Sequence, residues 1–215
     1  MTTNQEFKNS ALSVLRGNWA AGVLATLVYA VVMCIITGAT SIGQIFSDPF
    51  SSSILGLAGF STILLMLLVG FPVIVGFTYS FCALYVFADT RLVQNTFSYG
   101  FKQYGRAIGG ILLMQVFVFL WSLLLVIPGI VKSYSYALTP YILIDDPQIS
   151  VREAIRKSQR MMSGQKFNLF YLQLSFIGWF LLSCITGGIG FLWLCPYYMT
   201  SQAVFYRNLR DNLPA

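Results

Sequence analysis

Long apolar stretches separated by short polar segments run through the whole chain. A helix needs roughly 20 apolar residues to cross the hydrocarbon core of a bilayer. Six stretches meet or approach that length, and they lie at 19–37, 62–87, 108–127, 129–144, 167–185 and 189–206. The pattern predicts an all-α membrane protein in which six transmembrane helices form three hairpins.

Turn and break signals support the division into hairpins. Pro128-Gly129 is expected to be the turn between the third and fourth segments, and Gly187-Gly188 the turn between the fifth and sixth. Pro72 predicts a kink in the second segment, because proline lacks the amide proton that a helix interior needs. The fourth segment is short and polar, and Pro140 interrupts it.

Composition excludes several functional classes. Hydrophobic residues make up 57% of the chain and charged residues only 9%, whereas a soluble domain is roughly 45–50% apolar and about 25% charged. A soluble enzyme is therefore excluded. The chain has no His, which excludes zinc sites built on imidazole and catalysis by Ser-His or Cys-His pairs. We expect no cofactor, no metal site and no catalytic residue.

Basic residues indicate how the segments are oriented. With six crossings, the two termini and two of the loops share one side, and twelve of the thirteen Lys and Arg residues fall there. The positive-inside rule then places both termini in the cytoplasm. Lys132 is the exception, since it follows the Pro128-Gly129 pair. The net charge of +6 thus belongs to the inner membrane face and does not indicate nucleic acid binding.

A short helix with one apolar face is expected before each hairpin. The first has a capping box, in which Thr3 and Glu6 flank the helix start, and its Phe7 and Ala11 share one face. The third has a second capping box that begins at Ser150. We expect these apolar faces to lie at the headgroup boundary, while Lys and Arg meet anionic phosphates.

The middle short helix has the weakest pattern of the three. Phe97, Phe101 and Tyr104 form an aromatic stripe along it. Gly100 lies in the same stretch, and a glycine in a helix interior costs about 1 kcal/mol relative to alanine. The aromatic stripe is the face that we expect at the headgroup boundary.

Recurring features suggest three divergent units within a single membrane domain of residues 1–215. Each short helix ends at a glycine suited to a left-handed cap: Gly17, Gly105 and Gly164. Trp121 and Trp179 follow the similar segments 85–89 and 141–145 at comparable offsets. The units would span 3–88, 90–146 and 150–210. Such repeats can enclose a substrate path, but duplication of a stable hairpin would give the same pattern without one.

A cluster of basic residues marks a candidate lipid or partner surface. It comprises Arg152, Arg156, Lys157, Arg160 and Lys166. Lys and Arg near an anionic leaflet each contribute on the order of 1 kcal/mol to membrane binding. The surface could therefore bind anionic lipid headgroups or dock a protein partner at the cytoplasmic face. The alternative is that it only anchors and orients the helices.

A second set of residues marks a candidate cavity in the fourth segment. Lys132, Tyr134 and Tyr136 lie together there. An intramembrane charge is a functional hypothesis by default, and a polar, interrupted segment can line a cavity. The alternative is that Lys132 extends its ammonium group to the outer interface and that the segment is a packed helix.

The acidic pair Asp145-Asp146 precedes Pro147 at the cytoplasmic end of the fourth segment. Two adjacent carboxylates could hold Mg²⁺ together with further ligands. A helix stop followed by a turn is the favoured interpretation, because a proline disfavours helical backbone at the residue before it. Basic side chains in the helix that follows could neutralise both acids.

The chain also resembles a known family. The motifs that carry the resemblance are Pro128-Gly129, the segment 141–147, Met161-Met162-Ser163-Gly164, the segment 174–179, the segment 187–190 and Pro196-Tyr197-Tyr198. Over roughly 105–210 these resemble the bacterial integral membrane family catalogued as domain of unknown function 975. More distantly, the chain is similar to the membrane domains attached to some bacterial glycerophosphodiester phosphodiesterases. The resemblance implies a multi-span helical protein of the bacterial cytoplasmic membrane, and it supplies no catalytic residues.

These observations favour a non-catalytic protein that handles a lipid or another amphiphile at the cytoplasmic leaflet. Two alternatives stay open. One is an accessory or scaffold subunit of a membrane complex, docked through the basic surface. The other is a transporter or channel with a path beside Lys132 in the fourth segment.

Overall fold

The computed structural model describes residues 4–45, 60, 63–102, 104–124 and 126–212, and within these residues it contains helices and no strand. Three candidate membrane spans are long and apolar enough to cross a bilayer: Trp19–Gly38, Ile63–Phe87 and Lys166–Ile185. A shorter apolar helix covers Ile108–Leu123. The all-α membrane class is therefore confirmed, whereas the count of six crossings stays a prediction.

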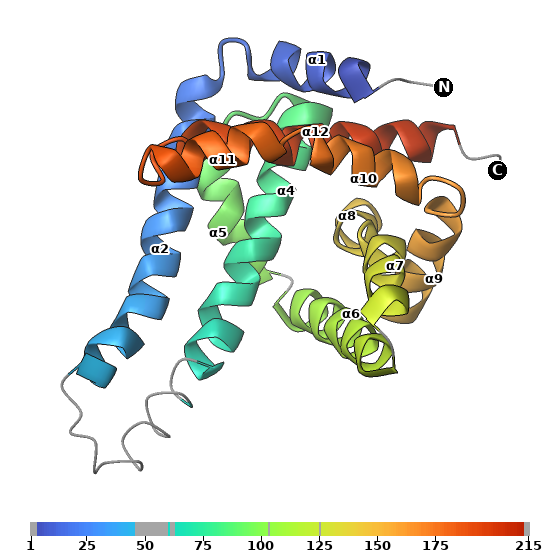
Figure 1. Cartoon of the computed structure of the whole chain (residues 1–215), viewed down its shortest axis with the longest axis horizontal. Coiled ribbons are helices and arrows are strands. Elements are labelled where there is room, and N and C mark those ends of the chain that lie inside the picture. Colours follow the sequence, from blue (N-terminus) through green and yellow to red (C-terminus); the bar gives the residue numbers. More distant parts are fainter. Residues whose placement is uncertain (1–3, 46–59, 61–62, 103, 125, 213–215) are drawn as a thin grey trace.

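The described part of the chain is almost entirely helical. Their bounds are α1 (Asn4–Leu15), α2 (Trp19–Ile45), the π-helical turn η1 (Met66–Gly70), α4 (Phe71–Phe87), α5 (Leu92–Lys102), α6 (Tyr104–Leu124), α7 (Val126–Tyr136), α8 (Thr139–Asp145), α9 (Val151–Met161), α10 (Lys166–Leu174), α11 (Ile177–Ile185) and α12 (Phe191–Asp211). Figure 1 shows α2 and α4 running side by side, while α11 and α12 cross them at a steep angle. The helices do not form a parallel bundle.

Two hairpins close on the same kind of contact. In α6 and α7, a Cβ on Gly129 would meet the backbone and side chain of Ser122. In α11 and α12, a Cβ on Gly190 would meet the same atoms of Ser183. Glycine removes the Cβ and lets the paired helices approach closely, as small residues do where membrane helices pack.

One of the two expected turns lies elsewhere. Gly187 and Gly188 do form the turn between α11 and α12, with φ of 64° and 92° that favour glycine. The Pro128-Gly129 pair, in contrast, lies inside α7, because α6 ends at Leu124 and α7 begins at Val126. Proline fits there because the first turn of a helix has no internal partner for its amide protons.

Two of the predicted spans are broken helices. The segment 129–144 is divided between α7 and α8 by a turn at Ala137 and Leu138. The segment 167–185 is divided between α10 and α11 by a turn at Ser175 and Phe176. Lys8 of α1 donates to the Ser175 carbonyl at 3.1 Å and lies 4.6 Å from the Phe176 ring centroid. Burial lowers the pKa of Lys8.

The apolar faces of α1 and α9 are buried against other helices. Phe7 and Ala11 of α1 are buried, and the Phe7 ring meets the edge of Phe205 of α12 at 5.4 Å between centroids. In α9, Ala154 is buried in the same core, and Ile155 is also buried. The expected position of these faces at the headgroup boundary is therefore wrong, because protein side chains already cover them.

The middle helix α5 packs through its small residues instead of its aromatic stripe. Its buried residues are Leu92, Thr96 and Gly100. A Cβ on Gly100 would collide with the Pro72 carbonyl of α4. The two helices are also joined by a hydrogen bond, because the Thr96 hydroxyl of α5 lies 2.9 Å from the Ser80 hydroxyl of α4. Gly100 is thus one of two glycines that let α4 and α5 approach closely, since a Cβ on Gly76 would likewise collide with the Thr96 carbonyl. Helix propensity counts Gly100 only as a destabilising residue.

Replacement of Gly100 tests this contact. We expect Gly100→Ala to lower the free energy of unfolding by about 1–3 kcal/mol, because the new methyl group would press on backbone that cannot rotate away. Gly109→Ala in α6 is the control, since no atom lies within 4 Å of a Cβ there. Thermal unfolding in detergent measures both. Equal melting temperatures for the two variants would contradict the close contact between α4 and α5.

Candidate functional site: an aromatic cavity with a polar end

A cavity of about 490 Å³ lies where α2, α4, α10, α11 and α12 meet. Its walls are mostly aromatic and aliphatic: Tyr29, Phe77, Gln173, Phe176, Ile177, Phe180, Phe191, Leu194, Cys195, Tyr198 and Met199. The volume falls in the range of about 300–1,000 Å³ that is typical of ligand sites. Among the described residues that line it, none carries a formal charge at neutral pH.

The cavity owes its walls to the crossing of the helices. Tyr29 of α2 stacks on Phe77 of α4, with 4.5 Å between ring centroids. From the other side, Phe180 of α11 and Phe191 of α12 meet edge to face at 5.3 Å. Because α12 crosses α2 and α4 steeply (Figure 1), these two aromatic pairs face a space that parallel helices would close.

A chain of polar side chains begins in the cavity wall at Gln173 and Tyr198, and these two residues form the polar end of the cavity. The Tyr134 hydroxyl donates to the Gln173 side-chain oxygen at 2.8 Å. The amide groups of Gln173 and Gln202 both interact with the Tyr198 hydroxyl. Gln202 in turn accepts a hydrogen bond from Tyr141 at 3.2 Å. This polar chain connects α7, α10, α12 and α8, and hydrogen bonds between helices hold apolar bundles together.

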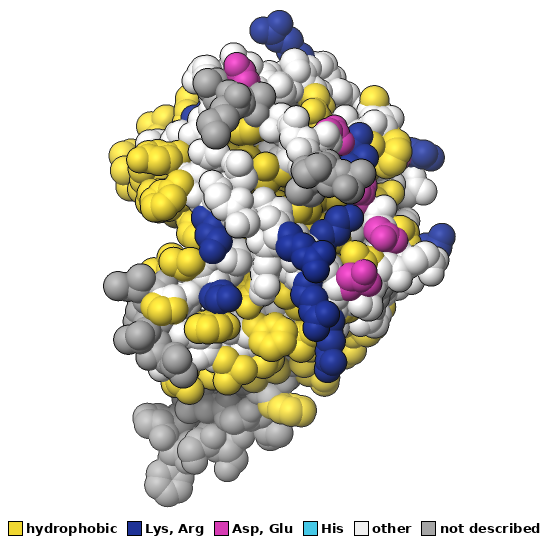
Figure 2. Space-filling view, turned by 90° about the vertical axis from the view of Figure 1, so that its right-hand side faces the viewer, with side chains coloured by type: hydrophobic (Ala, Val, Ile, Leu, Met, Phe, Trp, Pro, Cys, Tyr) yellow, Lys and Arg dark blue, Asp and Glu magenta, His cyan; other side chains and the backbone are white. Residues whose placement is uncertain are grey.

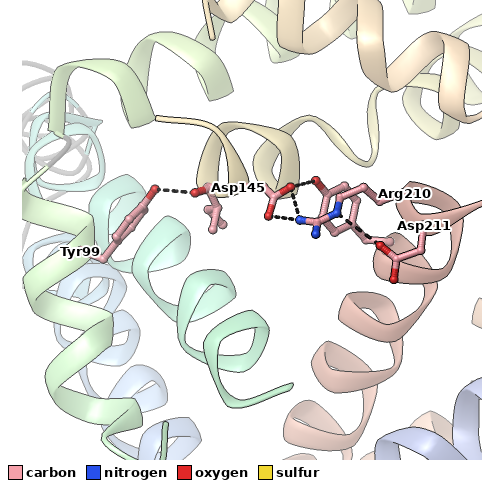
Figure 3. Close-up of polar contacts among 6 residues, drawn as sticks. Tyr99, Asp145, Arg210 and Asp211 are labelled. Carbon is pink, nitrogen blue, oxygen red and sulfur yellow. Dashed lines mark hydrogen bonds and ion pairs between the residues drawn. The ribbon is translucent and has the colours of Figure 1, made fainter. Parts of the chain in front are cut away.

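The polar chain leads to an ion pair at the end of α8. The Tyr141 ring stacks on Tyr206, with 5.5 Å between centroids. The Tyr206 hydroxyl donates to Asp145 at 3.0 Å, and the Arg210 guanidinium binds both oxygens of the same carboxylate (Figure 3). Tyr99 of α5 reaches the Ile144 carbonyl next to it at 3.5 Å.

The acidic pair therefore has a structural setting. Asp145 pairs with Arg210 of α12, so the expectation that a base in the following helix neutralises it is wrong. Asp146 accepts from the Gln148 amide at 2.9 Å, which closes a turn directly after α8, with Pro147 inside it. The described residues contain no group of three or more Cys, Asp or Glu side chains that could hold a metal ion. The helix stop is the interpretation that this geometry favours.

The three residues proposed from the sequence to line a cavity do not share one space, because Lys132 and Tyr136 contact α6 whereas Tyr134 contacts α10. Lys132 lies over the Trp121 ring at 4.7 Å from its centroid, a cation–π contact. Tyr136 is buried, and its ring centroid is 6.3 Å from that of Phe117. Of the three, only Tyr134 contacts a residue that lines the aromatic cavity, because its hydroxyl donates to Gln173.

Tyr134 also lines a smaller groove beside α10. The groove has a volume of about 220 Å³, and its lining residues are Ile130, Val131, Tyr134, Lys166, Phe167 and Phe170. It brings Tyr134 of the candidate cavity together with Lys166 of the basic cluster, which the sequence treats as separate sites. An apolar groove with a lysine beside it suits an acyl chain with an anionic headgroup.

The remaining bases of the cluster lie on the outer side of α9. Arg152, Arg156 and Arg160 are exposed, and Lys157 is half-buried. α9 lies toward the right-hand side of Figure 1, and on that side Figure 2 shows Lys and Arg gathered in a band between hydrophobic areas. Within the part of the chain that the structure describes, no ion pair involves the three arginines.

Two motif residues of the sequence have clear positions. Gly164 follows α9 with φ of 76°, a left-handed conformation that reverses the chain into α10. Trp179 lies on α11 with 57% of its surface exposed, outside the cavity. That position suits a side chain that faces lipid.

The sequence interpretation missed Gln173, Tyr198 and Gln202. Charged groups were the only polar signal considered within the apolar segments, and none of these three residues is charged. Amide side chains inside apolar segments are themselves a signal, since each needs a hydrogen-bonding partner in a medium without water. That signal indicates a polar contact, but it does not identify the partners, which come from other helices.

A comparison with protein families gives a match for most of the chain. A family model described as Protein of unknown function (DUF975) matches residues 60–213, which is more than half of the sequence. No curated protein and no solved structure matches the chain. The similarity to phosphodiesterase membrane domains and the bacterial source stay predictions.

Neutralising Asp145 tests the assignment of its role. We expect Asp145→Asn to lower the free energy of unfolding by about 1 kcal/mol, because the Asp145 and Arg210 side chains are partly exposed, at 29% and 32%. Arg210→Gln should cost a similar amount, and the double variant little more than either. Thermal unfolding with and without Mg²⁺ measures this. A clear stabilisation by Mg²⁺ that Asp145→Asn removes would restore the metal interpretation.

Proposed function

We propose that this chain, which belongs to the DUF975 family of proteins of unknown function, binds a lipid or another amphiphile at the cytoplasmic side of a bacterial inner membrane. The aromatic cavity is the observation that carries the proposal. Aromatic and aliphatic walls suit a hydrocarbon chain, and a few polar groups at one end suit a headgroup. We propose that the protein holds its ligand without chemical change, since the described residues that line the cavity include no acid–base pair.

The basic cluster and the groove support a position at the cytoplasmic leaflet. Exposed arginines on α9 can approach anionic phosphates without breaking an ion pair of the described residues. Lys166 lies beside the apolar groove, where an acyl chain and its headgroup can be held together. Anionic membrane lipids are thus the proposed surroundings of the protein.

An accessory role in a membrane complex is the second candidate. The same exposed row of Arg152, Arg156 and Arg160 favours it, because arginine is enriched at protein interfaces and its planar group binds carboxylates in pairs. The two functions differ in what cross-linking in native membranes would capture. A docked subunit gives one partner in fixed ratio, whereas a lipid-binding protein gives none.

We infer six crossings with both termini in the cytoplasm. The distribution of Lys and Arg along the chain supports this orientation. A threefold repeat is supported by the order of elements, since α1, α5 and α9 each precede a helical hairpin.

Cysteine labelling tests the orientation. In a variant without native cysteines, we expect a membrane-impermeant maleimide to label Thr186→Cys in intact cells and to leave Ser163→Cys unlabelled until the cells are opened. Both residues are exposed, so access depends on the side of the membrane. The cytoplasmic position must be exposed. Ser158 of α9 would not serve as that position, because it is buried and donates to the Ser135 carbonyl. The reverse labelling pattern would overturn the orientation.

Filling the cavity tests the function. We expect the protein purified in mild detergent to retain a lipid that is enriched over the bulk membrane. Cys195→Trp should remove most of that enrichment, because the indole would occupy the space between the aromatic walls. Mass spectrometry of the extracted lipids measures the difference. Leu181→Trp on the exposed side of α11 is the matched control and should retain the lipid.

A second cavity variant guards against a folding defect. Ile177 lines the cavity and is half exposed, so Ile177→Trp can narrow the space without repacking the core. Thermal unfolding shows which variants are folded. A lipid profile equal to the bulk membrane in the unchanged protein, or equal retention in all variants, would contradict the proposal.

A further inference from the structure

The polar end of the cavity offers hydrogen-bond donors. Gln173 accepts from Tyr134 through its side-chain oxygen, and its NH₂ group is a donor. The Tyr198 hydroxyl lies near the amides of Gln173 and Gln202, and its O–H group is also a donor. Both Gln173 and Tyr198 line the cavity. A headgroup there meets N–H and O–H groups, which are complementary to a carbonyl, ester or hydroxyl oxygen.

The same end lacks a charge that could balance an ionic headgroup. No Lys, Arg, Asp or Glu is among the described residues that line the cavity. Lys8 comes close to Phe176, but it is not among the residues that line the cavity, and its ammonium group donates to the Ser175 carbonyl. Burying an ionised group without a partner is far more costly than burying a neutral polar group that finds a hydrogen bond.

We infer that the cavity selects an uncharged amphiphile, a single hydrocarbon chain that ends in an ester or hydroxyl group of the kind found in a monoacylglycerol. The chain lies between the aromatic walls, and the oxygen atoms of the headgroup accept from Gln173 and Tyr198. This inference rests on the proposed function and narrows its ligand class. It separates the cavity ligand from the anionic lipids at the α9 surface.

The groove beside α10 provides the contrast within the same molecule. There Lys166 lies next to the apolar walls, so an anionic headgroup has a partner. Tyr134 separates the two sites, since it lines the groove and donates to Gln173 at the cavity. We therefore expect anionic lipids to bind in the groove and uncharged amphiphiles to bind in the cavity.

Competition among probes with the same chain tests the inference. The full-length protein is stripped of lipid in detergent and offered equal amounts of monooleoylglycerol, oleate and oleoyl lysophosphatidylglycerol. Native mass spectrometry then counts the bound molecules in the unchanged protein and in Cys195→Trp, and the occupancy that Cys195→Trp removes is assigned to the cavity. We expect monooleoylglycerol to account for most of it.

Variants of the polar end locate the headgroup. Tyr198→Phe keeps the ring and removes the hydroxyl, so it should weaken binding of monooleoylglycerol by about three- to tenfold, the usual effect of one hydrogen bond. Oleate occupancy should not change. Tyr171→Phe on the exposed side of α10 is the matched control and should bind as the unchanged protein does. Gln173→Leu should act in the same direction as Tyr198→Phe.

The outcomes separate this inference from the proposed function. If oleate or lysophosphatidylglycerol fills the cavity as well as monooleoylglycerol, the inference is wrong although lipid binding stands. The same holds if Tyr198→Phe binds monooleoylglycerol as tightly as Tyr171→Phe does. If Cys195→Trp removes no bound probe of any kind, the cavity is not a lipid site and both proposals fail.

Discussion

Polar side chains of α12 are what hold this apolar molecule in one arrangement. Tyr198 and Gln202 link α12 to α10 and α8, and Tyr206 and Arg210 bind Asp145 at the end of α8. In a membrane, lipid tails are as apolar as leucine, so burial of hydrophobic surface does not by itself choose between helix pairings. Hydrogen bonds and close fit must make that choice, and α12 carries the longest set of them among the described helices.

The proposed site depends on that arrangement. Because α12 is held across α2 and α4, the aromatic side chains of four helices line a space at the crossing. The break between α10 and α11 brings Gln173 and Phe176 to the same space, and Lys8 of α1 engages the break from the Ser175 side. A continuous, parallel helix in this position would leave no such opening. The polar chain and the cavity therefore have a common origin.

Most local patterns were reliable, although the Pro128-Gly129 pair lies inside α7 and not in a turn. Ser150 does cap α9, where its hydroxyl accepts from the Glu153 amide at 3.3 Å, and Gly187-Gly188 does reverse the chain. Patterns that needed a partner were less reliable. In α5, the close fit of Gly100 and Thr96 against α4 was not predicted, because the pattern of one helix does not show which residues of another helix lie opposite. A polar role for Gln173 and Tyr198 could be suspected from the sequence, but their partners on other helices could not be identified.

The sequence by itself determined the class of protein, the existence of most helices and the turns that glycine requires, since composition and periodicity act over a few residues. Tertiary structure alone decided which faces meet. Asp145 and Arg210 are far apart in the chain, so the residues around Asp145 do not indicate that Arg210 is its partner. In a protein that is apolar on its outside as well as its inside, hydrophobic periodicity cannot indicate which side of a helix is buried, so contacts between distant residues decide it.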